Sequence, residues 1–247
     1  EHTHIPLYHA TPYPGGIDLP KEYYHVIDPF VGLAAAAQAT KNLKLATGIC
    51  LVAQRDPIHL AKTISTLDQL SNGRFIFGVG NGWNHEEMEN HGVSPAVRSK
   101  LLAERISVLK KIWTEEKIEF RGEFHNYEPF ACWPKPVQTP HPPIVVGGGM
   151  PHGARRAISY GNGWLPFDAQ IGSIEEEVKK FRDMAEGEGR NPNDLPISLV
   201  VSTRDRCKLE LYRECGIHRV VFLIWTANRD VVLSELDEVS ELMNSIT

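Results

Sequence analysis

The chain has 247 residues, of which 42% are hydrophobic and 23% are charged, and its formal net charge is −5. This balance is typical of a globular protein with one large domain over 1–247, and it argues against nucleic acid or an anionic membrane surface as the main partner. No apolar run approaches the roughly 20 residues of a membrane span, and no signal-peptide pattern opens the sequence. The four cysteines form no CxxC pair, which predicts reduced thiols in a cytoplasmic protein.

Strands and helices alternate along the first half of the chain. The predicted elements are a helix capped by Asp28 and Pro29, a buried strand over 43–51, a helix that begins at Asp56 and Pro57 and ends at Gly73, a strand over 74–79 and, after a polar loop, a helix near 98–113. The helices carry apolar residues at helical spacing: Phe30, Leu33 and Ala37, then Leu60, Ile64 and Leu67, then Leu102, Ile106, Leu109 and Trp113.

The second half resumes the alternation after an interruption. Residues 118–142 hold aromatic residues and five prolines, which predict an irregular excursion. The elements predicted after it are a strand over 143–147, a helix over 153–160, a strand over 163–167, a helix capped by Ser173 and Glu176, a strand over 197–202, a helix near 205–214, a strand over 219–224, and a final helix capped by Asn228 with Val232, Leu236, Val239 and Met243 on its inner face.

Six strands, each followed by a helix, predict a parallel sheet that is buried on both faces. Eight such units would close a (β/α)8 TIM barrel of about 250 residues. Glu1-His2 has the character of a strand exit, so we expect a first βα unit of roughly 30 residues to be absent from this chain. An open doubly wound sheet is the alternative architecture.

Two strands run directly into glycine-rich loops. Residues 74–79 continue into Gly80-Asn81-Gly82-Trp83, and residues 143–146 continue into Gly147-Gly148-Gly149. Glycine after a parallel strand lets a ligand approach the backbone, and a following helix N-terminus favours anions. The sequence therefore predicts an enzyme with a phosphate-bearing cofactor.

Several motifs together resemble one known family. They are Glu1-His2, residues 45–48 (LATG), Arg55-Asp56-Pro57, residues 67–74 (LDQLSNGR), residues 78–84 (GVGNGWN), residues 134–138 (PKPVQ), and Gly147-Gly148-Gly149 followed by Arg155-Arg156-Ala157 and residues 161–164 (GNGW). In order and spacing the chain resembles the bacterial-luciferase-like oxidoreductases, and most of all their coenzyme F420-dependent branch. The resemblance implies a TIM barrel with a deazaflavin at the C-terminal ends of the strands.

The resemblance also implies a set of site residues. His2 corresponds to a histidine near the reactive face of the cofactor, where an imidazole can exchange a proton with a substrate oxygen. The cofactor-binding residues would be Thr47, Gly48 and Ile49, where the family often has a non-prolyl cis peptide, then Gly80, Asn81 and Gly82, then Gly147, Gly148 and Gly149, with Arg155 and Arg156 near the acidic tail of F420.

Other interpretations of these residues stay open. Trp83 stands where sugar-phosphate dehydrogenases of the family carry a glutamate acid; Glu86 or Glu87 could replace that acid, although helix-surface charge is the simpler interpretation. His2-x-His4 also opens metal-dependent barrel hydrolases. The later strand ends, at Asn81-Gly82, Gly148-Gly149, Pro166 and Trp225, supply no further zinc ligands, so no metal is expected.

The predicted function is F420-dependent hydride transfer to or from a small-molecule substrate. The alternatives are an FMN-dependent monooxygenase of the same fold, which would need a separate reductase, and a non-catalytic flavin-binding protein. The opening segment, with His4, Tyr8, His9, Tyr13, Tyr23, Tyr24 and His25, resembles a loop over the mouth of the site. A homodimer is expected because dimers are frequent in the family.

Overall fold

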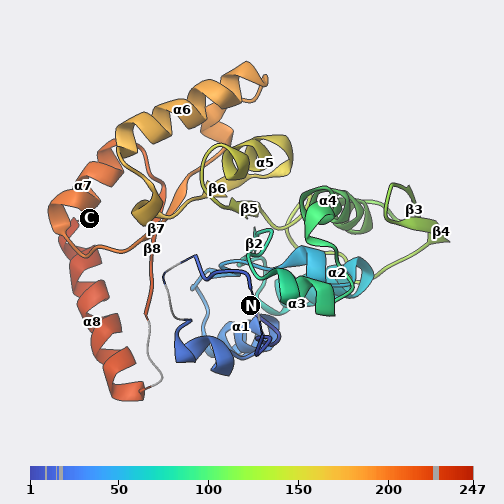
Figure 1. Ribbon diagram of the computed structural model, residues 1–247, viewed down its shortest axis with the longest axis horizontal. Helices are drawn as coiled ribbons and strands as arrows, with labels where there is room; N and C mark the ends of the chain where they lie inside the picture. The colour runs from blue at the N-terminus through green and yellow to red at the C-terminus, as the bar shows by residue number, and fades with distance from the viewer. Residues whose placement is uncertain (9, 15, 17–18, 225–227, 247) are drawn as a thin grey trace. The chain divides into compact units, whose positions relative to one another are not determined.

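The computed structural model describes residues 1–8, 10–14, 16, 19–224 and 228–246, so His9 and Trp225 of the motifs above lie outside the described residues. The chain divides into two compact units, Glu1–Ile144 and Val145–Thr247. Figure 1 shows the elements of both units.

The first unit contains helices, two parallel strands and a hairpin. Its elements are α1 (Pro29–Ala39), β1 (Leu45–Ala46), α2 (Pro57–Leu70), β2 (Phe75–Val79), α3 (His85–Asn90), α4 (Arg98–Thr114), β3 (Ile118–Arg121) and β4 (Asn126–Phe130), with short 3₁₀ helices at Lys21–His25, Val52–Gln54 and Pro95–Val97.

The core of this unit forms around β2. β1 pairs with β2 in parallel through Leu45↔Phe75 and Ala46↔Ile76, and an isolated bridge joins Cys50 to Val79. α2 packs against α1 and α4, and the apolar stripes predicted for α2 and α4 are buried. The buried strand predicted over 43–51 is only partly regular, because the pairing is interrupted between Ala46 and Cys50.

Helix boundaries follow the predicted caps. The Asp28 side chain accepts hydrogen bonds from two backbone N–H groups of α1, and Asp56 caps α2 in the same way through His59. α2 ends at Leu70, and two consecutive residues with positive φ follow it, Asn72 at 52° and Gly73 at 72°; glycine adopts this conformation without steric cost.

Two segments differ from prediction. Residues 118–130 are not irregular but form the antiparallel hairpin β3–β4 (Figure 1), because the prolines that suggested an excursion lie mostly beyond it. The polar loop before α4 contains α3, a helix of six residues whose sequence HEEMEN carries one large apolar side chain, Met88. A stretch this short and polar gives no hydrophobic period.

The second unit is a parallel βα array. Its elements are β5 (Ile144–Gly147), α5 (His152–Tyr160), β6 (Gly163–Leu165), α6 (Ile174–Gly187), β7 (Ser198–Val201), α7 (Arg206–Glu214), β8 (Arg219–Phe222) and α8 (Arg229–Ile246), with 3₁₀ helices at Asp168–Gln170 and Pro192–Asp194. β5 pairs with β6 and β7 with β8, both in parallel, and parallel bridges join the β6 segment to β7 at Trp164↔Ile197 and Phe167↔Val200.

Packing in this unit confirms α6 and corrects α8. Trp164 stacks on Phe181 of α6 with ring centroids 4.7 Å apart, and both side chains are buried. α8 packs against α7, but of its four predicted inner residues only Val239 is buried, while Leu236 is 48% and Met243 is 55% exposed. The inner-face prediction for α8 was wrong. Helical spacing predicts which side of a helix is apolar, but it does not predict how much of that side another element covers.

Within the described residues, the six predicted strands correspond to β1, β2, β5, β6, β7 and β8, and each pair assigned among them is parallel. None of the described helices is both long and apolar enough to cross a membrane. All four cysteines are free thiols, as predicted.

Candidate functional site

The ends of β1 and β2 approach each other closely. Thr47 is buried, and its hydroxyl donates to Gly78 O at 2.7 Å. A Cβ on Gly78 would collide with the carbonyl of Thr47, and one on Gly80 would lie 2.6 Å from the Ile49 side chain. The Gly48–Ile49 peptide is cis, which agrees with the non-prolyl cis bond expected at this place. The structure therefore brings Thr47, Gly48 and Ile49 beside the glycine-rich end of β2.

The loop after β2 presents an amide at the strand ends. Asn81 Nδ2 donates to Ser99 Oγ at 2.7 Å, and Asn81 Oδ1 is buried without a partner among the described residues. Gly82 has φ +76° and packs against Met88 and Leu51. A buried acceptor without a partner is costly, so Asn81 Oδ1 is suited to accept a hydrogen bond from a ligand.

His2 has a hydrogen-bond partner at each ring nitrogen. Its Nδ1 lies 2.6 Å from Glu87 Oε2, and its Nε2 lies 3.1 Å from Trp83 Nε1. Because an indole N–H can only donate, Nε2 is the acceptor in the second contact, and Nδ1 carries the proton that His2 donates to Glu87. These two partners hold the neutral imidazole in one tautomer, with the lone pair on Nε2.

Glu87 is fully buried, so the interpretation of this residue as helix-surface charge was wrong. Its backbone N–H donates to Asn84 Oδ1 at the start of α3, and its Oε1 accepts from the backbone N–H of Thr3 at 2.9 Å. Burial alone would raise the pKa of Glu87, but hydrogen bonds from His2 and Thr3 hold that pKa below its usual value. The buried group is therefore a carboxylate.

Glu86 anchors the opening segment instead of serving as an acid. Its carboxylate accepts from the Thr11 hydroxyl at 2.7 Å and from the backbone N–H of Ala10 at 2.7 Å. These hydrogen bonds, with that of Thr11 foremost, lower the pKa of Glu86 to about 2. Neither Glu86 nor Glu87 is thus a proton donor at neutral pH, and the sequence's suggested replacement for the missing acid is not supported.

Aromatic rings surround His2. Its ring centroid lies 5.6 Å from that of Trp83 and 5.5 Å from that of Tyr23, and Tyr13 lies 5.6 Å from Trp83. The Tyr13 hydroxyl donates to that of Tyr23 at 3.2 Å, and burial with this contact raises the pKa of Tyr23 far above its usual value. Tyr23 of the opening segment therefore forms a neutral wall beside His2, and Tyr13 packs behind it against Tyr23 and Trp83.

Arg55 fixes the start of the chain, a role that no sequence pattern indicated. Its Nε donates to Glu1 Oε1 at 2.8 Å, and its Nη2 donates to Asp28 Oδ2 at 3.0 Å. The backbone N–H of Leu51 donates to the same Glu1 oxygen at 3.2 Å. His2 follows Glu1 directly, so these contacts tie the residue before it to the segment 51–55 that follows β1.

The second unit carries the other predicted glycine loop. Gly148 is exposed with φ +115°, and a Cβ built on it would lie 3.1 Å from Arg156 Nη2. Gly149 O accepts from Gly153 N at 2.7 Å as the chain enters α5. Arg155 is exposed, and Arg156 is half-buried. Gly147 is the buried last residue of β5. Gly148 and Gly149 follow it as a more open backbone turn before a helix N-terminus with a guanidinium beside it, an arrangement that fits a phosphate.

Of the predicted site residues, the structure places Thr47, Gly48 and Ile49 beside Gly80 in the first unit. His2 contacts Trp83, the residue that follows Gly80-Asn81-Gly82. In the second unit, Gly148 lies beside Arg156. Arg155 belongs to the second unit as an exposed residue on α5.

The family profile described as luciferase-like monooxygenase matches residues 9–206. The chain is 38% identical over 226 residues to the uncharacterized protein Rv0953c of Mycobacterium tuberculosis, covering 90% of this chain and 79% of that protein. It is 31% identical over 159 residues to the FMNH(2)-dependent dimethylsulfone monooxygenase of Pseudomonas putida, covering 63% and 43% of the two chains. It is 27% identical over 176 residues to the F420-dependent hydroxymycolic acid dehydrogenase of M. tuberculosis, covering 69% and 48%.

Among solved structures, the monooxygenase RslO1 of Streptomyces bottropensis matches with a TM-score of 0.64 and 25% identity, over 93% of this chain and 75% of that one. The chain belongs to the luciferase-like monooxygenase family, and its fold class is the α/β TIM barrel of that family. The family holds both F420-dependent and FMN-dependent oxidoreductases.

Proposed function

We propose that the protein is an F420-dependent oxidoreductase that oxidises an alcohol or, in the opposite direction, reduces a carbonyl-like group. The observation that carries the proposal is His2, held in one tautomer at the strand ends of the first unit by a buried carboxylate, Glu87. Hydride transfer to or from such a substrate needs a proton acceptor and donor beside the substrate oxygen, and an imidazole supplies both.

Residues in each unit fit the expected cofactor. In the first unit, the buried acceptor Asn81 Oδ1 and the close-packed backbone at Thr47, Gly48, Ile49, Gly80 and Gly82 suit a planar ring with N–H donors. In the second unit, Gly147, Gly148 and Gly149 with Arg155 and Arg156 suit a phosphate and an acidic tail. When bound, F420 would supply or accept a hydride.

His2 would accept and donate the proton of the substrate oxygen. As the hydride leaves the carbinol carbon of an alcohol, Nε2 accepts the hydroxyl proton in place of its contact with Trp83. The imidazolium that forms is stabilised by the Glu87 carboxylate at Nδ1, 2.6 Å away, in a site partly shielded from water. In the reverse direction His2 returns the proton to the carbonyl oxygen. Tyr13 and Tyr23 would limit the substrate to a small, weakly charged molecule.

The second candidate is a two-component FMN-dependent monooxygenase, favoured by the relative that uses FMNH(2). It would need a separate reductase as partner. A non-catalytic flavin-binding protein is the third candidate. A cytoplasmic location and a homodimer stay predictions.

Parallel titrations test the cofactor. The full chain is titrated with F420 and with FMN while the fluorescence of each cofactor is followed, and Asn81→Ala is compared with Lys117→Ala, a change on a distant exposed side chain. We expect micromolar binding of F420, weaker binding of FMN, and weakening by Asn81→Ala alone. A preference for FMN would establish the second candidate instead, and binding without turnover across an alcohol and ketone screen would favour the third.

A further inference from the structure

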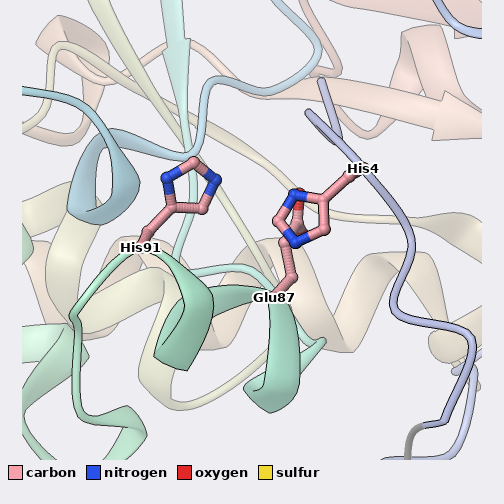
Figure 2. A group of neighbouring side chains, drawn as sticks. All are labelled: His4, Glu87 and His91. Carbon is pink, nitrogen blue, oxygen red and sulfur yellow. The ribbon is translucent and has the colours of Figure 1, made fainter.

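Three side chains beside the His2 network form a second cluster within the first unit. Figure 2 shows Glu87 on α3 and His91 at the end of that helix, with His4 on the opening segment that faces them. Each offers one ligand atom, and the three atoms lie within 4.8 Å of one another. Glu87 is buried, whereas His4 and His91 are exposed, so the cluster is open to solvent on one side.

The local fold explains why these residues meet. Glu87 lies in α3 and His91 is its C-cap residue, four positions later, so both fall on one side of the helix. His4 comes from the opening segment, which the hydrogen bond from Thr3 N to Glu87 Oε1 holds against α3. The rings of His4 and His91 are 5.5 Å apart.

The Thr3 hydroxyl marks the centre of the cluster. Its Oγ1 lies 2.7 Å from His91 Nε2, 3.0 Å from His4 Nδ1 and 3.4 Å from Glu87 Oε1. Three potential metal ligands therefore surround a single point. Zinc binds imidazole nitrogen and carboxylate oxygen at about 2.0–2.2 Å, so modest rotations of two exposed histidines would close the site around an ion.

We propose that His4, Glu87 and His91 bind a divalent transition metal of the Zn²⁺ class, with water as the fourth ligand and the Thr3 hydroxyl displaced. Two neutral imidazoles and one carboxylate form a donor set that such ions prefer over Mg²⁺ or Ca²⁺. The sequence prediction of no metal considered only strand ends as sources of further ligands, whereas His91 caps a helix, α3, that was not predicted.

Neighbouring groups would orient the ligands. Glu87 Oε2 is already hydrogen-bonded to His2 Nδ1, which directs Oε1 toward the cluster. Asn90 Nδ2 lies 2.9 Å from His4 Nε2, and a flip of this amide would let Asn90 accept the Nε2–H of a His4 bound through Nδ1. A bound ion would thus join the opening segment to α3 and share Glu87 with His2.

Calorimetric titration of the EDTA-treated, dialysed full chain with ZnCl₂ tests the site. We expect one equivalent to bind with micromolar or tighter affinity, and His4→Ala and His91→Ala each to weaken it about 10-fold or more. Two matched changes control the result. His59→Ala removes an exposed imidazole on α2, and Thr3→Val removes the hydrogen bonds at the centre without removing a proposed ligand. Both should retain the affinity of the unchanged chain.

A titration with CoCl₂ supplies a second readout, because the intensity of the visible absorption of Co²⁺ distinguishes four-coordinate from six-coordinate ions. Circular dichroism establishes that each variant is folded. Absence of binding below millimolar metal, unchanged affinity in both histidine variants, or a loss in Thr3→Val equal to that in His91→Ala would overturn the proposal. The test needs neither F420 nor substrate, so it is independent of the proposed function.

Discussion

At the scale of single residues, the His2 ring is defined by what each nitrogen contacts. A histidine at the start of a loop would ordinarily sample several rotamers and both tautomers, which makes it a poor proton carrier. Here the Glu87 carboxylate accepts the proton of Nδ1, and Trp83 donates to Nε2. In the proposed function, a substrate oxygen would take the place of Trp83 at Nε2.

Replacement of Glu87 by glutamine tests this arrangement. Glutamine keeps the shape but removes the negative charge that stabilises an imidazolium at His2, so kcat should fall about 10- to 100-fold with little change in KM. The measurement is steady-state F420-linked turnover, run with EDTA present so that metal at His4 and His91 does not contribute. Glu89→Gln, on the exposed side of α3, is the matched control. A kcat equal to that of the unchanged chain would rule out a role for the Glu87 charge.

At the scale of elements, the long apolar segments were predictable and the short polar ones were not. α2 and α4 carry apolar residues at a spacing that places them on one side of a helix. Asp28, Asp56 and Ser173 were predicted as N-caps, and the structure confirms all three. α3 has six residues and no stripe, and its two buried side chains are Met88 and Glu87, the latter a residue type that is ordinarily exposed. The sequence pattern therefore did not predict Glu87 as the partner of His2, because the two residues are 85 positions apart in the chain.

Asp68 of α2 holds the segment after the hairpin in place. The side chain is fully buried; Oδ2 accepts from the backbone N–H groups of Val137 and Gln138, and Oδ1 accepts from Gln138 Nε2 at 2.7 Å. Asp68→Asn would turn one acceptor into a donor that faces donors. We expect a loss of about 2–3 kcal/mol in the free energy of unfolding, measured by urea denaturation.

The matched change is Asp183→Asn on α6. Asp183 is 58% exposed and pairs with Lys179 at the surface, so its loss should cost less than about 1 kcal/mol. Equal costs at the two positions would show that the buried hydrogen bonds of Asp68 contribute no more than a surface pair.

Glu104 of α4 anchors the turn of the β3–β4 hairpin. It accepts from the backbone N–H groups of Glu123, Phe124 and His125, and from His125 Nδ1 at 2.9 Å. Burial alone would raise the pKa of Glu104, but these hydrogen bonds outweigh it and lower the pKa. The folded pKa lies below the unfolded one, so the stabilisation is fully present above about pH 4.3 and is lost as pH falls through the folded pKa.

Glu104→Gln should therefore cost about 1–3 kcal/mol at pH 7 and little at a pH below the folded pKa, where the native side chain is protonated as well. Denaturant unfolding at several values between pH 7 and pH 2.5 measures the difference. Glu128→Gln, on an 83% exposed side chain of the same hairpin, is the control. A cost for Glu104→Gln that stays constant across this range would contradict the assigned hydrogen bonds.

At the scale of the whole molecule, regular βα alternation predicted the six parallel strands, and the resemblance of the motifs to one family predicted the TIM-barrel fold class. The predicted strands and helices alternate across the boundary at Ile144 as they do in the rest of the chain. The sequence therefore did not predict the division into two compact units. The sequence also did not predict the side-chain contacts within each unit. Alternation of strands and helices predicts which end of a strand faces a site, but it does not predict which atoms meet there. The glycine loops were predictable since both follow strands directly.

Charge supplies the last prediction. The molecule is net negative at −5, whereas F420 is a polyanion, so long-range attraction cannot bring the two together. Fields are screened within about 8 Å at physiological ionic strength, so in the proposed function local cations such as Arg155 and Arg156 would decide the affinity for F420. Arg155→Ala should weaken the binding of F420 about 5- to 20-fold, and it should leave the binding of a deazaflavin without the phosphate and acidic tail unchanged. Rising salt concentration should weaken the binding of F420 to the unchanged chain. Arg206→Ala, an exposed arginine paired with Glu210, is the control for charge alone. If salt instead strengthened binding, repulsion from the whole molecule would dominate, and the two arginines would not be the tail site.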